Sequence, residues 1–185
     1  MPMTDDLALD QRDGLPDALR VLLETYPRAG WNSHANFAGL VQFWLERHVM
    51  FRKLTSLLQE DAERAMDGKL DPEQQKARLS RFGGALVNDL HGHHQIEDHH
   101  YFPALSGMEP SLLKGFTILD KDHHAMDGLL DRFTKSANGV LQNGGEVGRF
   151  REELLSFDAM LDRHLVDEED LIVPVILKHG ADALH

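Results

Sequence analysis

One metal-ligand pattern occurs twice in this chain, and it constrains the fold more than any other feature. The first copy reads HHQIEDHHYFP from His93 to Pro103, and the second reads HLVDEEDLIVP from His164 to Pro174. In each copy a His is followed four residues later by Glu, then by a second acidic residue, and ten residues on by Pro. The duplication indicates two similar helical hairpins in one chain.

Each copy has a further His upstream on an apolar segment. His48 lies 45 residues before His93, and His123 lies 41 residues before His164. Apolar residues flank each of these histidines at helical spacing, so we expect all four to lie on the core-facing stripe of their helices.

Helical geometry predicts which side chains converge. Positions four residues apart lie on one face of a helix. His93 and Glu97 therefore point the same way, as do His164 and Glu168. Burying four imidazoles and two carboxylates is costly unless they are paired or bind a metal. Imidazole with carboxylate suits iron, zinc or manganese, and paired carboxylates suit a two-metal site.

Composition excludes several classes of protein. The 185 residues indicate one domain. A net charge of −12 without a basic run argues against nucleic acid and against anionic membranes. Cysteine is absent, so any metal must be held by nitrogen and oxygen. The acidic N-terminus does not resemble a signal peptide, and no apolar stretch reaches 18 residues, so we expect a cytoplasmic protein.

The chain reads as all-α, an antiparallel up-down four-helix bundle with a short extra N-terminal helix. We expect residues 1–30 to form an N-terminal extension, with 1–13 loosely attached, and residues 31–180 to form the bundle. Stop signals are Asp67-Gly68, Pro103, Asn143-Gly144-Gly145 and Pro174. The expected long helices cover 33–66, 71–101, 110–142 and 146–172.

These residues resemble the haemerythrin-like (HHE cation-binding) domain family over about residues 34–178. The resemblance rests on His48, on the two His-x-x-x-Glu phrases and on His123. It implies a non-haem di-iron centre in which the two Glu bridge the irons and the His cap them. It also implies binding of O2 or a response to oxygen, nitric oxide, peroxide or iron.

One position departs from the oxygen-carrying members of that family. They place a second His four residues after the first on the third helix, and here that residue is Asp127. Two residues are candidates for the open place: His94, which shares an arc of its helix with His93, and Asp127 itself. His124 is a separate, adjacent-register alternative to His123. The predicted metal set is His48, His93, His94, Glu97, His123, His164 and Glu168.

Three functions compete on this evidence. The first is a di-iron module that binds or senses O2, NO or iron. The second is a di-iron enzyme that acts on peroxide or ferrous iron, although no acid–base residue for catalysis stands out. The third is a helical bundle with an incidental metal, for which zinc or manganese is the less favoured alternative to iron. Fewer imidazoles and an open position favour sensing or redox chemistry over reversible O2 carriage.

Overall fold

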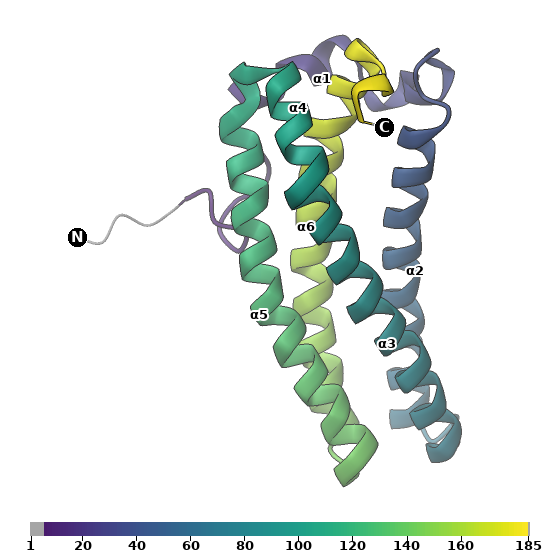
Figure 1. Cartoon of the computed structure of the whole chain (residues 1–185). Helices are drawn as coiled ribbons and strands as arrows, with labels where there is room; N and C mark the ends of the chain where they lie inside the picture. Colours follow the sequence, from purple (N-terminus) through teal and green to yellow (C-terminus); the bar gives the residue numbers. More distant parts are fainter. Residues whose placement is uncertain (1–5, 185) are drawn as a thin grey trace, which may run out of the picture. The chain divides into compact units, whose positions relative to one another are not determined.

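The computed structural model describes residues 6–184, apart from the side chain of Asn143, and within them it contains helices and no strand (Figure 1). The long helices are α2 (Leu40–Met66), α3 (Pro72–Ile96), α5 (Leu113–Asn143) and α6 (Val147–His179). The shorter elements are η1 (Asp17–Leu19), α1 (Val21–Thr25), η2 (Arg28–Ser33), η3 (Glu97–Tyr101), α4 (Phe102–Met108), η4 (Pro110–Leu112) and η5 (Asp182–Leu184). The all-helical class predicted from sequence is confirmed.

The chain divides into two compact units, and each contains segments of all four long helices. The first unit comprises Met1–His48, His94–His124 and Arg163–His185, and the second comprises Val49–His93 and Ala125–Asp162. The second unit has an aromatic core in which Phe133 lies against Phe150 and Phe157, with ring centroids 5.6 and 5.8 Å away.

Local signals placed three helix ends correctly. The Asp71 carboxylate accepts hydrogen bonds from the backbone N–H groups of Glu73 and Gln74, at 3.1 and 3.3 Å, and so caps α3. Gly68 and Gly144 follow α2 and α5 with φ of 69° and 59°. Glycine adopts this left-handed backbone without steric cost, which ends both helices where the sequence predicted.

The start of α2 was predicted wrongly. The expected helix began near Ser33, but residues 28–33 form the 3-10 helix η2, and α2 begins at Leu40. Gly39 precedes α2 with φ of 86°, which no right-handed helix accommodates. The helical periodicity before Gly39 therefore belongs to a separate element.

Pro103 was expected to end its helix and Pro174 to kink or end its helix, but neither proline ends a helix in the structure. Beyond Ile96 the chain makes the π-helical turn η3 and continues as α4, with Pro103 in the first turn of α4, where its missing N–H is tolerated. Pro174 lies inside α6. The buried Val175 and Ile176 each contribute about 1.5–3 kcal/mol, which offsets the proline's cost of about 3 kcal/mol.

The N-terminal residues are part of the first unit's core. Leu15, Leu19 and Trp31 are buried in the same cluster as Phe116 and Leu171. Leu9 is also buried, 6% exposed. The expectation that residues 1–13 are loosely attached is therefore wrong for residues 6–13, and residues 1–5 lie outside the described part. Buried apolar side chains attach this segment to the core. The polar residues around them made the segment look loosely attached in the sequence.

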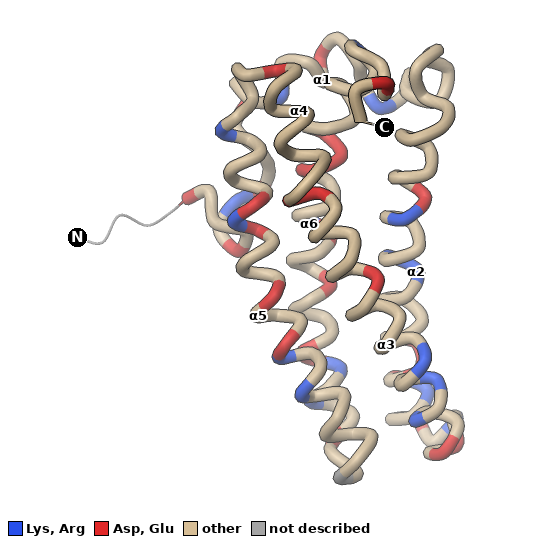
Figure 2. Tube along the Cα trace, in the orientation of Figure 1, with Lys and Arg blue, Asp and Glu red and all other residues tan. Residues whose placement is uncertain are grey.

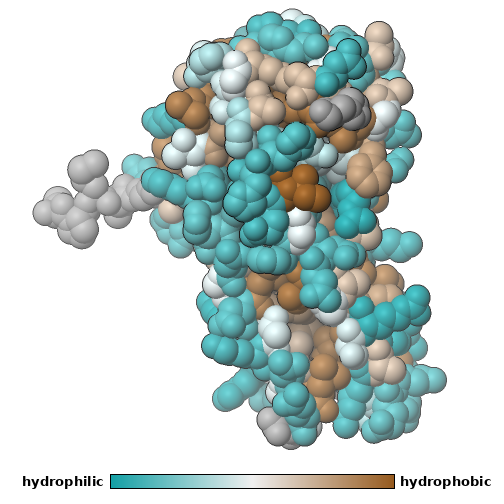
Figure 3. All heavy atoms as spheres, viewed as in Figure 1, coloured by the Kyte–Doolittle hydropathy of each residue, from teal (hydrophilic) through white to brown (hydrophobic). Residues whose placement is uncertain are grey.

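Polar residues cover much of the surface. Acidic side chains occur on each of the four long helices (Figure 2). The face drawn in Figure 3 is mostly hydrophilic, with separate hydrophobic patches. In residues 6–184, no helix combines the length and the apolar character that a membrane crossing requires.

Candidate metal centre

The first group of candidate ligands consists of three imidazoles in the first unit. His94 comes from α3, His123 from α5 and His164 from α6, and each offers a nitrogen within 4.8 Å of the others. Their rings are 2%, 3% and 0% exposed. The rings of His94 and His123 stack at 3.9 Å between centroids, and that of His164 lies 5.4 and 4.9 Å from them. Three buried nitrogens at this spacing fit one metal ion.

The second group combines one imidazole with two carboxylates. His48 from α2, Glu97 from η3 and Glu168 from α6 offer donor atoms within 4.8 Å of one another, and all three are fully buried. His93 is the last residue of a segment of the second unit, where it is 8% exposed and its ring lies 5.3 Å from that of Phe51. This second set has the donor types of an iron, zinc or manganese site.

Glu168 links the two groups. Its Oε1 lies 3.2 Å from Nε2 of His48, in the second group. Its Oε2 lies 2.9 Å from Nε2 of His164 and 3.5 Å from Nε2 of His123, in the first group. One carboxylate thus faces imidazoles of both groups, which is the position that a bridging ligand requires.

Three of these histidines each have a carboxylate in contact with the ring nitrogen Nδ1. The carboxylate oxygen lies 2.6–2.9 Å from the ring's Nδ1. A carboxylate at this nitrogen fixes the ring's orientation and directs Nε2 toward a metal. The pairs are His48 with Glu169, His123 with Asp98, and His164 with Asp122.

Sequence reasoning missed these three carboxylates, yet the repeat carried a signal for two of them. Asp98 and Glu169 are the acidic residues that directly follow Glu97 and Glu168 in the duplicated phrase. Each reaches the lone upstream His of the opposite copy. The repeated Glu-acid pair therefore has two functions, since the first residue faces the donor groups and the second orients an imidazole.

The donor atoms fit a metal ion. Nε2 of His123 and Nε2 of His164 are buried and have no partner in hydrogen-bond geometry among the described residues. Both atoms face carboxylate oxygens of Glu168, and Nε2 of His123 also lies 3.5 Å from Oε1 of Glu97. Buried nitrogens without hydrogen bonds are costly in a protein interior, and a cation between them and the carboxylates removes that cost.

The carboxylates make these imidazoles unusually basic when no metal is bound. Burial, the largest influence, lowers the pKa of His123, but Asp98 and Glu168 outweigh it and raise the pKa to about 9. At His164, burial is again outweighed, by the charge of Glu168 and the hydrogen bond to Asp122, and the pKa rises to about 10. Burial raises the pKa of Glu168, but the charge of His164 and the contacts with His123 and His48 outweigh it and hold that pKa well below its ordinary value.

We expect these shifts to make the metal-free protein less stable as pH rises. A histidine whose pKa is raised on folding stabilises fully below its unfolded value of about 6.5, and that contribution is lost as pH rises through the folded value. For His164 the stabilising contribution is therefore lost as the pH rises from about 6.5 to about 10. Denaturant melts of chelator-treated protein at pH 7 and pH 10 measure the fall in unfolding free energy. Metal-free His164→Gln must show a smaller fall, and an equal one contradicts the prediction.

Trp44 is an additional contact of the site. Its indole Nε1 donates a hydrogen bond of 3.2 Å to Oε2 of Glu97, and its ring lies 4.1 Å from that of His48. Trp44 is 4% exposed. The structure therefore shows a buried residue that orients a candidate ligand.

The structure separates the two candidates for the open ligand position, and it separates His123 from its alternative His124. His94 is buried beside His123 and His164, whereas the side chain of His124 is 76% exposed and Asp127 is exposed. We expect His94→Ala to lose metal and His124→Ala to keep the wild-type content. Metal analysis of both variants after the same purification checks this. Equal metal content in the two variants would exclude His94 as a ligand.

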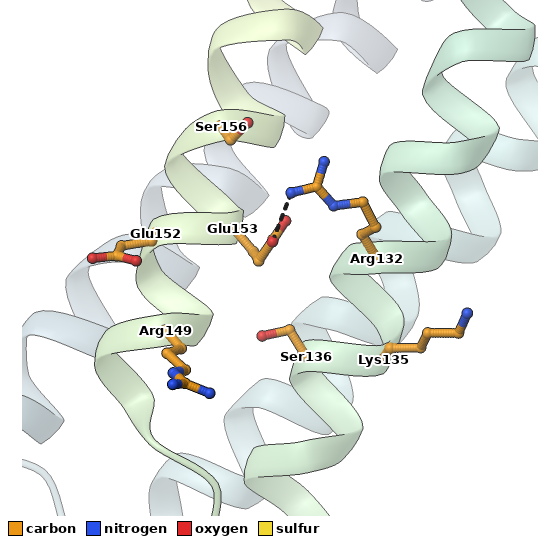
Figure 4. Close-up of a pocket in the computed structure, with 7 residues that line it drawn as sticks. All are labelled: Arg132, Lys135, Ser136, Arg149, Glu152, Glu153 and Ser156. Atoms are coloured by element: carbon orange, nitrogen blue, oxygen red, sulfur yellow. Dashed lines mark hydrogen bonds and ion pairs between the residues drawn. The ribbon is translucent and has the colours of Figure 1, made fainter.

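A surface groove lies elsewhere, in the second unit. It is a groove of about 570 Å³ between α5 and α6, lined by Arg132, Lys135, Ser136, Arg149, Glu152, Glu153 and Ser156 (Figure 4). Nη2 of Arg132 donates a hydrogen bond of 2.8 Å to Glu153. Because both basic and acidic side chains line the groove, their charges largely offset one another.

The fold and the site together define an all-helical protein with a buried His and Glu cluster suited to a metal cation. The family model Hemerythrin HHE cation binding domain matches residues 39–176. The chain therefore belongs to the hemerythrin HHE cation-binding family, as its repeated motif predicted. The comparisons with curated proteins and with solved structures give no match.

Proposed function

We propose that this protein is a non-haem di-iron protein that binds or senses O2, NO or iron. The observation that carries the proposal is the pair of adjoining ligand groups, one of three imidazoles and one of imidazole and carboxylates, linked by Glu168. Nitrogen and oxygen donors in this mixture suit iron, with zinc or manganese as alternatives. The finer architecture that we propose is the antiparallel up-down four-helix bundle of the family, in a cytoplasmic protein.

The proposed ligands extend the groups by one residue. His93 precedes His94 in α3 and stands four residues before Glu97, so the helical spacing that motivated its choice supports it as a ligand beside Glu97. The proposed set is then His48, His93, His94, Glu97, His123, His164 and Glu168. Bound iron would supply reversible electron transfer and a position for a small ligand.

The residues around the groups support a small, weakly polar ligand. An apolar cavity of about 10 Å³, room for about one water-sized molecule, lies in the first unit. Trp44 and Tyr101 line this cavity, and Trp44 also donates to Glu97. A diatomic molecule matches this size, whereas a larger organic substrate does not. Nucleic acid and membranes remain outside the proposal because of the acidic charge.

A di-iron enzyme acting on peroxide or ferrous iron is the second candidate. The raised pKa of Tyr101, caused by burial and by the charge of Glu97, keeps a protonated phenol beside the same cavity. Such a hydroxyl is a potential proton donor to a bound ligand. Multiple turnovers of peroxide at a rate that Tyr101→Phe lowers would favour the enzyme over the sensor.

The deciding experiment is metal content per chain on freshly purified protein, with absorption spectra before and after exposure to air. The proposal expects two irons per chain, one for each group, and new near-ultraviolet and visible bands in air. One iron, or zinc with a featureless spectrum, would contradict the di-iron proposal and favour the helical bundle with an incidental metal.

A further inference from the structure

Two arginines in the N-terminal residues contact the carboxylates that orient candidate metal ligands. Arg12 is 6% exposed although it precedes the first helical element, and Arg28 begins η2. The guanidinium of Arg28 lies 4.8 Å from the ring of the buried Trp31. Both arginines lie before residue 39, where the family match begins. Their contacts are therefore features of this chain beyond the matched domain.

Arg12 holds the carboxylate that orients His164. Its Nη1 donates to Oδ1 of Asp122 at 2.7 Å, and its Nη2 donates to Oδ2 of the same residue. Oδ2 of Asp122 in turn lies 2.9 Å from Nδ1 of His164. A two-pronged contact fixes both the position and the rotation of a carboxylate, which a single contact does not.

Arg28 makes a single, more exposed contact with the carboxylate that orients His48 in the other group of ligands. Its Nη1 donates to Oε1 of Glu169 at 3.1 Å, and Oε2 of Glu169 lies 2.7 Å from Nδ1 of His48. Nε of Arg28 also donates to Asp170 at 2.9 Å, so its guanidinium is held in place. Each ligand group therefore has one histidine connected through one carboxylate to an N-terminal arginine.

We propose that residues 7–33 form a strap whose Arg12 and Arg28 are positioning residues for His164 and His48, so that docking of the strap and metal binding stabilise each other. The inference rests on the proposed metal function. Imidazoles that are already oriented bind a metal more tightly, because less conformational entropy is lost when the metal binds. Because metal binding and strap docking are coupled, a metal that binds the oriented imidazoles more tightly stabilises the docked strap by the same free energy.

Substitution tests the positioning role. We expect Arg12→Gln and Arg28→Gln to lower metal affinity by up to about 10-fold, the low end of the range for losing a carboxylate that holds a ligating imidazole, because each arginine acts through such a carboxylate. Arg12→Lys, which keeps the charge but loses the two-pronged contact, must fall between Arg12→Gln and wild type. The matched control is Arg20→Gln in the same strap, because Arg20 pairs with the exposed Asp17. Competition with a chelator of known affinity measures Fe²⁺ binding under argon, with Zn²⁺ in parallel.

Hydrogen exchange on the unsubstituted protein tests the linkage without relying on any variant. Removing the metal must raise amide exchange in residues 7–33, well before exchange rises in the second unit's core. Unchanged exchange in the strap, or variants that bind metal as tightly as Arg20→Gln, would overturn the strap while leaving the metal function intact. A wild-type protein that binds neither Fe²⁺ nor Zn²⁺ would overturn the metal function and the strap with it.

Discussion

Glu168→Ala is expected to leave the protein with at most one metal ion per chain. Glu168 faces His48 of one ligand group and His164 of the other, at 3.2 and 2.9 Å, so its loss removes a donor from both. The remaining imidazoles of the first group, His94 and His123 with His164, keep one possible site. Metal analysis and the absorption spectrum in air measure the change, and Glu168→Gln tests the loss of charge at constant side-chain size.

The control for this experiment is Glu152→Ala, which removes an exposed acidic residue from the same helix. It must keep the wild-type metal content. Helix content of both variants by circular dichroism separates loss of metal from loss of fold. A Glu168→Ala protein that folds and still holds two metal ions would exclude Glu168 as the link between the groups.

Metal removal is expected to lower the melting temperature by about 10 °C. A ligand present at a thousand times its dissociation constant stabilises the folded state by about 4 kcal/mol, and each kcal/mol shifts the melting temperature by about 2–4 °C at this chain length. Without the cation, the carboxylates of Glu97 and Glu168 and the basic imidazoles around them remain buried. Calorimetry before and after chelation, at fixed pH, measures the shift.

The shift must depend on the metal site and must reverse. Returning Fe²⁺ to the chelated protein is expected to restore the melting temperature, and the same treatment of Glu168→Ala is expected to give a smaller shift. If chelation lowers the melting temperature of both proteins by the same amount, the stabilising metal lies somewhere other than the site described above.

The sequence was sufficient for the all-helical class and for several of the helix ends. The stops at Gly68 and Gly144 and the cap at Asp71 depend on residues that are neighbours in the chain, so local rules placed them. The same is true of His164 and Glu168, because four-residue spacing on a helix fixes their common face. Prolines misled the prediction, since the apolar burial around Pro174 depends on other helices.

Only the tertiary structure decided which carboxylate holds which histidine. The Arg12 contacts span 110 and 155 residues of chain, and His48 reaches Glu169 across 121. No local periodicity encodes such pairings, because they follow from how segments distant in sequence pack together. The sequence by itself thus determined an all-helical chain with His and Glu candidate ligands on its core-facing stripes. The packing decided that His94 lies inside and His124 outside, and that Arg12 and Arg28 reach the carboxylates that orient His164 and His48.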